Sequence, residues 1–156
     1  MEIRCIIIDD EPLAINVLET HLKALPEIKI IGSYNNPLEA FAMLKTTEVD
    51  LIFLDIEMPL LNGLDFIKNS NTKAKIILTT AHRDYAPESY ELEVADYLLK
   101  PISFSRLFKA INRLKGLPGN IMAAAHPIDQ GVKNEHIYVN ANKKYIKVRF
   151  DTILYI

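Results

Sequence analysis

The chain has 156 residues, 49% of them hydrophobic and 24% charged, with a formal net charge of −2 and one cysteine. This length suits one ordinary domain plus a shorter remainder, and the composition excludes disordered, collagen-like and mucin-like chains. A single cysteine cannot form an internal disulfide, which predicts a reducing, cytoplasmic setting. The longest apolar runs are only a few residues long, so we expect neither a transmembrane helix nor a secretory signal.

The net charge hides a difference between two parts of the chain. Residues 1–134 carry 14 Lys and Arg against 18 Asp and Glu, whereas residues 135–156 carry 4 against 2. A negative total excludes a nucleic-acid-binding surface over the whole molecule. The basic excess near the C-terminus indicates that the last residues are a separate part of the chain.

Short apolar runs alternate with helical patterns over the first 115 residues. The expected strands are Ile3–Ile8, Ile28–Ile31, Leu51–Leu54, Ile76–Leu78 and Tyr97–Leu99. The expected helices cover residues 12–25, 37–44, 63–67, 87–92 and 104–114. This alternation predicts right-handed βαβ units, and therefore an α/β fold with a doubly wound, five-stranded parallel sheet and helices on both of its faces.

The first and the last of these helices carry apolar stripes. The stripe of the first helix consists of Leu13, Val17, Leu18, Leu22 and Leu25. The stripe of the last helix, which Ser103 is expected to cap, consists of Phe104, Leu107, Phe108, Ile111 and Leu114. Such helical spacing predicts that both stripes face the core.

The helical pattern stops near residue 116, where glycine, proline and alanine become frequent. We therefore expect a first domain over residues 1–118 and a linker over 119–134. Beyond the linker, His136–Asn140 and Tyr145–Phe150 flank a turn and predict a short β hairpin.

A further strand begins at Asp151, and an apolar edge ends at Ile156. An exposed apolar edge is an aggregation hazard in a finished protein. We therefore predict that residues 135–156 are the opening strands of a second domain that this chain does not complete. The alternative is that these strands extend or cap the first domain.

Polar side chains stand at the carboxyl ends of four of the five expected strands. They are Asp9, Asp10, Glu11, Asp55, Thr80 and Lys100. Taken singly, an Asp at a strand end is more often a turn former or a helix cap, and a lone Lys is usually a surface residue. Together they are more informative, because the carboxyl ends of parallel strands share one edge of the sheet, where ligands bind.

Several carboxylates at one edge repel one another unless a cation neutralises them. Oxygen ligands without nearby His or Cys favour Mg²⁺. Lys100 offers a compact positive charge for a phosphoryl group and Thr80 a hydroxyl donor. These neighbours make Asp55 a candidate nucleophile toward phosphorus.

Four motifs in this order resemble a response-regulator receiver domain. They are Ile6–Pro12 (IIIDDEP), Leu51–Pro59 (LIFLDIEMP) followed by Asn62-Gly63, Thr79–Ala81 (TTA) and Asp96–Pro101 (DYLLKP). The resemblance covers residues 1 to about 118. It implies the flavodoxin-like (βα)5 fold of that family, of which a chemotaxis regulator is an example.

The resemblance also implies a role for each matching residue. Asp55 corresponds to the phosphoacceptor, which takes a phosphoryl group from a sensor histidine kinase. Asp10 corresponds to the main Mg²⁺ carboxylate, with Asp9 as its water-mediated partner. Asp55 and the backbone carbonyl of Glu57 complete the implied metal ligands.

The remaining matches concern the phosphate and the switch. Lys100 corresponds to the lysine that contacts the phosphate, and Thr80 to the switch hydroxyl that moves toward it. Tyr97 corresponds to the switch aromatic that turns inward on activation. Pro101 corresponds to a position that usually follows a cis peptide bond.

Further segments are similar to the LytTR (LytR/AlgR-type) class of regulators. Residues 81–86 and 90–102 resemble LytTR receivers, and residues 136–156 resemble the opening strands of the LytTR DNA-binding domain. The resemblance implies a transcription regulator whose receiver controls a DNA-binding output domain, incomplete here. The implied partners are a sensor histidine kinase, DNA through the missing part, and a second copy through the fourth and fifth helices, without a membrane.

Two other classes of function compete with this interpretation. A phosphatase or phosphotransferase of the haloacid-dehalogenase type would place two Asp spaced by one in the first strand motif, whereas here Asp9 and Asp10 are adjacent. A phosphate-independent interaction domain would be expected to lose Asp10, Asp55, Thr80 or Lys100, and all four are present. We therefore expect self-phosphorylation and autodephosphorylation only, not an enzyme.

Overall fold

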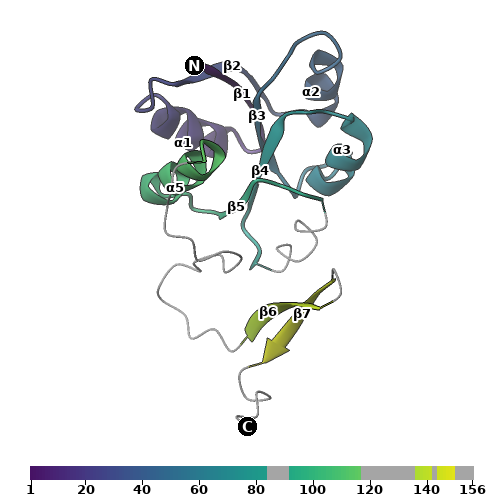
Figure 1. Cartoon of the computed structure of the whole chain (residues 1–156). Helices are drawn as coiled ribbons and strands as arrows, with labels where there is room; N and C mark the ends of the chain where they lie inside the picture. The colour runs from purple at the N-terminus through teal and green to yellow at the C-terminus, as the bar shows by residue number, and fades with distance from the viewer. Residues whose placement is uncertain (84–91, 117–135, 142–143, 150–156) are drawn as a thin grey trace. The chain divides into compact units, whose positions relative to one another are not determined.

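The computed structural model of the protein describes residues 1–83, 92–116, 136–141 and 144–149 (Figure 1). The chain divides into two compact units, Met1–Gly119 and Asn120–Ile156, and each is described by itself. The expected linker, the further strand from Asp151 and most of the expected fourth helix lie outside the described residues.

The first unit contains five strands and four described helices. The strands are β1 (Ile3–Ile8), β2 (Ile28–Tyr34), β3 (Leu51–Asp55), β4 (Lys75–Thr80) and β5 (Asp96–Leu99). The helices are α1 (Pro12–Leu22), α2 (Pro37–Met43), α3 (Gly63–Ser70) and α5 (Phe104–Leu114). All five strands are parallel, in the order β2-β1-β3-β4-β5. The predicted doubly wound parallel sheet is confirmed.

The central strands β1 and β3 are buried on both faces. In β1, Cys5 and Ile7 pack into one hydrophobic cluster, whereas Ile6 and Ile8 pack into the cluster on the opposite face. This division follows from the two-residue period of a strand, which sends successive side chains to opposite faces. The first cluster includes side chains of α1 and α5, and the second includes side chains of α2 and α3. The sheet therefore has a helical layer on each face, as Figure 1 shows.

The helices begin where the local sequence favours a start. The Asn36, Asn62 and Ser103 side chains accept hydrogen bonds from the first turns of α2, α3 and α5. Pro12 and Pro37 occupy early positions of α1 and α2, where the missing N–H of proline costs nothing. The predicted Ser103 cap is confirmed.

The predicted apolar stripes are only partly correct. Leu18 and Leu22 of α1 and Leu107 and Ile111 of α5 are buried. The side chains of Leu13, Val17, Phe104 and Phe108, by contrast, are exposed. On each helix the exposed residues form their own i, i+4 row beside the buried row, and the sheet covers only one of the two.

The second unit contains two described strands, β6 (His136–Ala141) and β7 (Lys144–Arg149). They pair in antiparallel fashion, with His136 opposite Arg149 and Ala141 opposite Lys144. The predicted hairpin strands are thereby confirmed. Among the described residues of both units, we find no helix long and apolar enough to cross a membrane.

Candidate functional site

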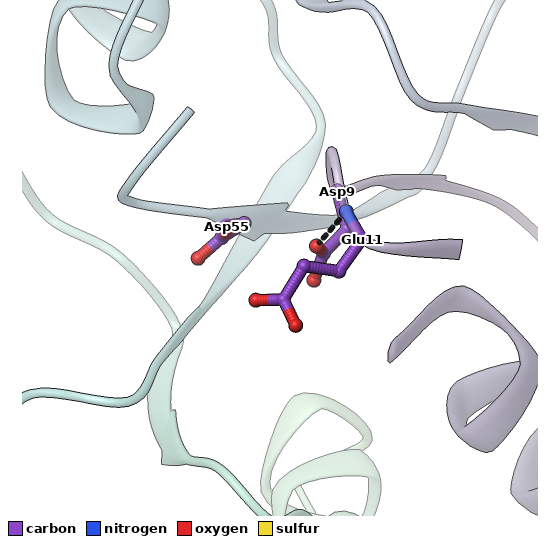
Figure 2. A group of neighbouring side chains, drawn as sticks. All are labelled: Asp9, Glu11 and Asp55. Carbon is purple, nitrogen blue, oxygen red and sulfur yellow. Dashed lines mark hydrogen bonds between the residues drawn. The ribbon is translucent and has the colours of Figure 1, made fainter. Parts of the chain in front are cut away.

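Three carboxylates meet at the carboxyl edge of the sheet. Asp9 follows β1, Asp55 ends β3, and Glu11 lies in the loop between β1 and α1. One oxygen from each lies within 4.8 Å of the other two (Figure 2). The neighbouring strands fix this placement, because the parallel register sets Ile8 beside Leu54 immediately before the two Asp residues.

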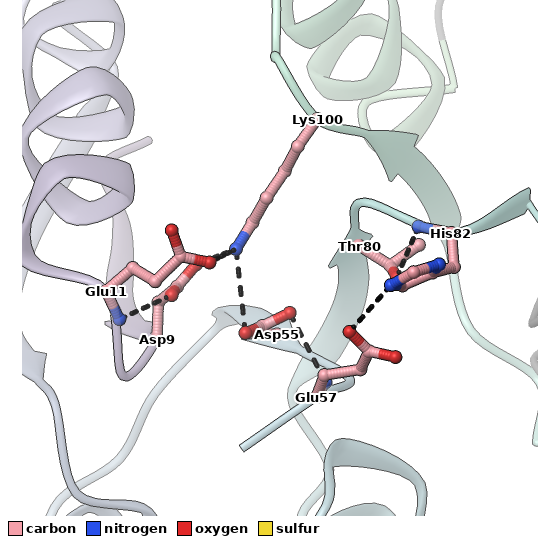
Figure 3. A network of polar contacts seen from close by, with 7 residues as sticks. All are labelled: Asp9, Glu11, Asp55, Glu57, Thr80, His82 and Lys100. Atoms are coloured by element: carbon pink, nitrogen blue, oxygen red, sulfur yellow. Dashed lines mark hydrogen bonds and ion pairs between the residues drawn. The ribbon is translucent and has the colours of Figure 1, made fainter.

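Lys100, which follows β5, reaches the same three carboxylates (Figure 3). Its Nζ lies 2.8 Å from Asp9 Oδ2, 3.4 Å from Glu11 Oε1 and 3.5 Å from Asp55 Oδ2. The Lys100 backbone N–H donates to the Thr80 carbonyl oxygen at 2.7 Å, which ties the start of this loop to β4. The Lys100–Pro101 peptide bond is cis, as the sequence indicated.

Burial and charge set the electrostatics of this group. Burial, together with the nearby Asp9 carboxylate, raises the pKa of Asp55 to about 7, against the opposing effect of Lys100. Burial also raises the pKa of Asp9. Burial alone would lower the pKa of Lys100, but Asp9, Asp55 and Glu11 together raise it, so the ammonium stays charged.

Asp10 is placed in the same loop, between Asp9 and Glu11. Its Oδ1 atom is buried and has no hydrogen-bond partner among the described residues. A buried oxygen of this kind calls for a partner outside the protein chain, such as a cation or an ordered water. The three-carboxylate cluster contains Glu11 instead of the expected Asp10, and the acidic run after β1 was the only sequence signal for Glu11.

Thr80 and Tyr97 are both linked to the backbone of His82. Thr80 is fully buried, and its Oγ1 accepts a hydrogen bond from the His82 N–H at 3.0 Å. Tyr97 is buried as well, and its hydroxyl donates to the His82 carbonyl oxygen. The two predicted switch residues are thus joined through one residue that sequence reasoning did not place in the site.

The His82 side chain closes a second link across the same edge. Its Nε2 lies 3.0 Å from Glu57 Oε2 (Figure 3). Glu57 follows Asp55 by two residues, and its backbone N–H lies 3.4 Å from Asp55 Oδ1, to which it donates. The loops after β3 and β4 are therefore connected beside the Asp55 carboxylate.

Gly63 sets the position of α3 against the backbone of Asp55. A Cβ atom at Gly63 would lie only 2.4 Å from the Asp55 carbonyl oxygen. The Gly63 N–H donates to the Ile56 carbonyl oxygen at 2.8 Å, so the first residue of α3 is held against the end of β3. Only glycine permits this close approach.

Behind Tyr97, a buried ion pair joins β5 to α5. The Asp96 side chain has no exposed surface, and Arg106 binds it in bidentate fashion, at 2.6 Å to Oδ1 and 3.0 Å to Oδ2. Arg106 also donates to the Tyr97 carbonyl oxygen at 3.0 Å. Arg113 lies 3.4 Å from Asp96 Oδ2. Sequence reasoning did not find this pair.

The model of the response regulator receiver domain family matches residues 5–112. The chain therefore belongs to the response regulator receiver domain family, whose members act in two-component signalling. This result confirms the first part of the resemblance drawn from the sequence motifs.

Among curated proteins, the chain is 36% identical over 115 residues to a response regulatory protein of Shewanella oneidensis, covering 72% of this chain and 49% of that protein. It is also 36% identical over 115 residues to the transcriptional regulatory protein BtsR of Escherichia coli, covering 72% of this chain and 48% of BtsR. The chain thus spans about half the length of these relatives.

Among solved structures, the chain is similar to the response regulatory domain of mrkE from Klebsiella pneumoniae. The two share 34% sequence identity with a TM-score of 0.68, and the match covers 73% of this chain and 96% of that domain. The receiver fold is therefore shared with an experimentally determined relative.

Proposed function

We propose that this chain is the switch of a response regulator in which Asp55 accepts a phosphoryl group from a sensor histidine kinase. The observation that carries the proposal is the position of Asp55, a buried carboxylate with Asp9, Glu11 and Lys100 gathered around it. A carboxylate can attack phosphorus, and phosphoryl transfer depends mainly on positioning and on compensation of negative charge. Here the end of β3 positions Asp55, and the Lys100 ammonium compensates negative charge.

The proposed cofactor of this reaction is Mg²⁺. Its ligands would be the carboxylates of Asp9, Asp10 and Asp55 together with the backbone carbonyl of Glu57. These residues fit such an ion, because the gathered donors are carboxylate oxygens and the buried Asp10 Oδ1 still lacks a partner among the described residues. When bound, Mg²⁺ would offset the negative charge of the carboxylates and of the phosphoryl oxygens.

Asp55 must be ionised to attack phosphorus. Its pKa of about 7 leaves a substantial protonated fraction at neutral pH. The Lys100 ammonium, 3.5 Å from Asp55 Oδ2, favours the anion. Once Asp55 carries the phosphoryl group, the same ammonium is within reach of the new oxygens and can form a charge-assisted hydrogen bond to them.

Thr80 and Tyr97 are the proposed switch residues. A phosphoryl group on Asp55 adds acceptor oxygens to which the Thr80 O–H can donate, and the Thr80 oxygen is the atom that accepts from the His82 N–H. Any movement of Thr80 displaces the backbone of His82, whose carbonyl oxygen accepts a hydrogen bond from the Tyr97 hydroxyl. The buried orientation of Tyr97 is thereby coupled to the state of Asp55.

The output of the switch is proposed to be a LytTR-type DNA-binding domain that begins in the second unit. Three observations support this assignment: the LytTR-like motifs of the sequence, the β6–β7 hairpin, and the match of this chain to only 48% of the length of the transcriptional regulatory protein BtsR. The protein would act in the cytoplasm, as its lone cysteine suggests. Dimerisation through the fourth and fifth helices stays a prediction, because residues 84–91 are not described.

The proposal excludes sustained turnover of external substrates. The competing function is a phosphatase or phosphotransferase, which would regenerate its nucleophile after each cycle. The aspartyl phosphate would be bound by Lys100 and hydrolysed only within its own site. The rate of this hydrolysis would then set how long the signal lasts. We therefore propose that phosphorylation and autodephosphorylation of Asp55 are the only chemistry of this chain.

The test is incubation with Mg²⁺ and acetyl phosphate, followed by intact-mass measurement. We expect one phosphate-sized mass increase in the wild-type chain, none in Asp55→Asn, and none without Mg²⁺. Asp65→Asn, which changes a carboxylate in α3 outside the cluster, is the matched control and should be modified like the wild type. Modification that persists in Asp55→Asn, or a wild-type chain that stays unmodified, would overturn the assignment.

A second measurement separates the switch from the enzyme. Release of inorganic phosphate from a panel of phosphomonoesters should stay at the level of the Asp55→Asn variant. Turnover of many equivalents per chain would favour the phosphatase. For the output domain, the complete protein should bind a DNA site more tightly after phosphorylation, and the Asp55→Asn variant should lose this increase.

A further inference from the structure

Lys100 acts through its ammonium group, whose position depends on a short segment of the chain. Residues 100–103 connect the end of β5 to the start of α5, and we call them the Lys100 loop. The lysine side chain is a flexible stem, so its reach is set by where the backbone of this loop lies. Its Nζ lies 2.8 Å from Asp9 Oδ2 and 3.5 Å from Asp55 Oδ2 (Figure 3). The contacts that hold the loop therefore set the distance from the ammonium to Asp55.

The Lys100 loop is attached to the sheet at its first residue and to α1 at its third. The Lys100 N–H donates to the Thr80 carbonyl oxygen at 2.7 Å. Two residues later, the Ile102 carbonyl oxygen lies 2.9 Å from His21 Nε2. A carbonyl oxygen can only accept, so Nε2 is the donor of this hydrogen bond. The two bonds come from different elements, and together they restrict the backbone on both sides of Pro101.

The His21 ring is itself held in one orientation. It lies in the last turn of α1, and its centroid is 5.8 Å from that of the Phe104 ring, at the first residue of α5. Its neighbours Leu18 and Leu22 are buried in the same hydrophobic cluster as Ile102, which anchors this turn of α1 on the sheet. A donor that packing already holds in place loses little side-chain entropy when it forms its hydrogen bond.

The buried Ile102 side chain and the His21 hydrogen bond restrict different motions of the loop. The Ile102 side chain is buried in the core, and this burial keeps the loop near α1. The hydrogen bond fixes the direction of the Ile102 carbonyl, which side-chain burial leaves free to rotate. Rotation at this position would shift the backbone of Lys100, and a shift of about 1 Å in a reacting group can lower a rate by up to about a hundred-fold.

From this geometry we propose that His21 is a positioning residue for phosphoryl transfer, which fixes the Lys100 loop and thereby holds the ammonium beside Asp55. His21 is not a member of the carboxylate cluster, and its effect passes through Lys100 alone. The inference rests on the proposed function, because it presupposes that Lys100 contributes to the phosphorylation of Asp55.

The test is the rate at which acetyl phosphate modifies the full 156-residue chain at saturating Mg²⁺, followed by intact-mass measurement. We expect His21→Ala to lower the rate about three- to ten-fold, because the Lys100 loop loses its hydrogen bond to α1. His21→Gln should recover most of the wild-type rate, since its amide N–H can donate to the Ile102 carbonyl oxygen. Thr20→Ala removes an exposed side chain that is bonded within α1, and as the matched control it should react like the wild type.

A double-variant cycle separates positioning from a general weakening of the fold. Lys100→Ala should slow phosphorylation, and adding His21→Ala to it should slow the reaction no further, because the ammonium that His21 positions is then absent. All rates are compared at a temperature at which urea unfolding shows each variant to be fully folded. If His21→Ala lowers the rate by the same factor with and without Lys100, its role is merely structural and the proposal is overturned.

The remaining outcomes distinguish this inference from the proposed function. A wild-type chain that stays unmodified, or a Lys100→Ala variant that reacts at the wild-type rate, would overturn both. A slow Lys100→Ala variant together with His21→Ala at the wild-type rate would overturn the assignment of His21 alone. The same holds for a His21→Gln variant as slow as His21→Ala, because the hydrogen bond would then not be the cause.

Discussion

Removal of Arg106 should destabilise the receiver unit strongly, because it leaves the Asp96 carboxylate buried without its main partner. Asp96 has no exposed side-chain surface, and in the part of the chain that the structure describes its two shortest ionic contacts come from Arg106, at 2.6 and 3.0 Å. Among the described residues, Arg106→Met leaves Asp96 with the Tyr97 N–H at 2.7 Å and Arg113 at 3.4 Å. Methionine keeps much of the apolar stem, so the change tests the charge and its hydrogen bonds.

The expected size follows from this geometry. Breaking a buried ion pair by removing one partner costs about 3–5 kcal/mol when nothing replaces it. Arg113 can compensate in part, so we expect a loss of about 2–3 kcal/mol. The assay is urea unfolding at neutral pH, followed by circular dichroism and analysed for the free energy of unfolding and for the slope m.

Two comparisons isolate the pair. Arg83→Met, at an exposed position, should change stability by no more than about 0.5 kcal/mol. The double variant Asp96→Asn with Arg106→Met should be more stable than Arg106→Met alone, because no uncompensated anion stays buried. Two results would refute the reasoning. One is a loss of stability below about 1 kcal/mol for Arg106→Met. The other is a double variant whose loss of stability equals the sum of the losses for Arg106→Met and Asp96→Asn, each measured alone.

Three further predictions concern the site itself. The pKa of Asp55 is raised from the ordinary aspartate value of 3.8 to about 7, so between these pH values the folded chain holds a proton that the unfolded chain has released. The free energy of unfolding should therefore fall as pH rises through this window. In metal-free urea unfolding, Asp55→Asn should show a flatter dependence of this free energy on pH and should be more stable than the wild type by on the order of 1–3 kcal/mol at pH 8. The same pH dependence in both proteins would contradict this prediction. Gly63→Ala should cost about 1–3 kcal/mol in the same assay, because its Cβ collides with the Asp55 carbonyl oxygen, and a neutral effect would show that α3 can shift freely. Mg²⁺ at ten times its dissociation constant should stabilise the wild-type chain by about 1.4 kcal/mol in thermal unfolding, and the gain should be smaller in Asp10→Asn; equal gains would remove Asp10 from the ligands.

The sequence was sufficient to predict the sheet, because its signals are local. Runs such as Ile6–Ile8 and Leu51–Leu54 are apolar throughout, and this composition indicates strands buried on both faces. Proline and asparagine mark the starts of the helices that follow. The exposed rows were not predictable, because helical spacing shows that Leu13 and Leu18 belong to apolar rows but not which row the sheet will cover.

The site was predictable to the extent that strand ends define it. Asp9, Asp55 and Lys100 come together because parallel strands end at one edge. The contacts made by His82 were not predictable, since they arise from the path of a loop. The Asp96–Arg106 pair was missed for a similar reason: its members lie ten residues apart on different elements, and only the packing of α5 brings them into contact.

The register between β1 and β3 fixes the position of Asp9 relative to Asp55. Ile8 lies opposite Leu54, and the next residue on each strand is an aspartate. Strands advance about 3.3 Å per residue, so a slip by one position would carry Asp9 away from Asp55 and turn its side chain to the other face of the sheet. Substitutions deep in the core, far from any charged group, can therefore abolish the chemistry of the site while leaving every one of its residues in the sequence.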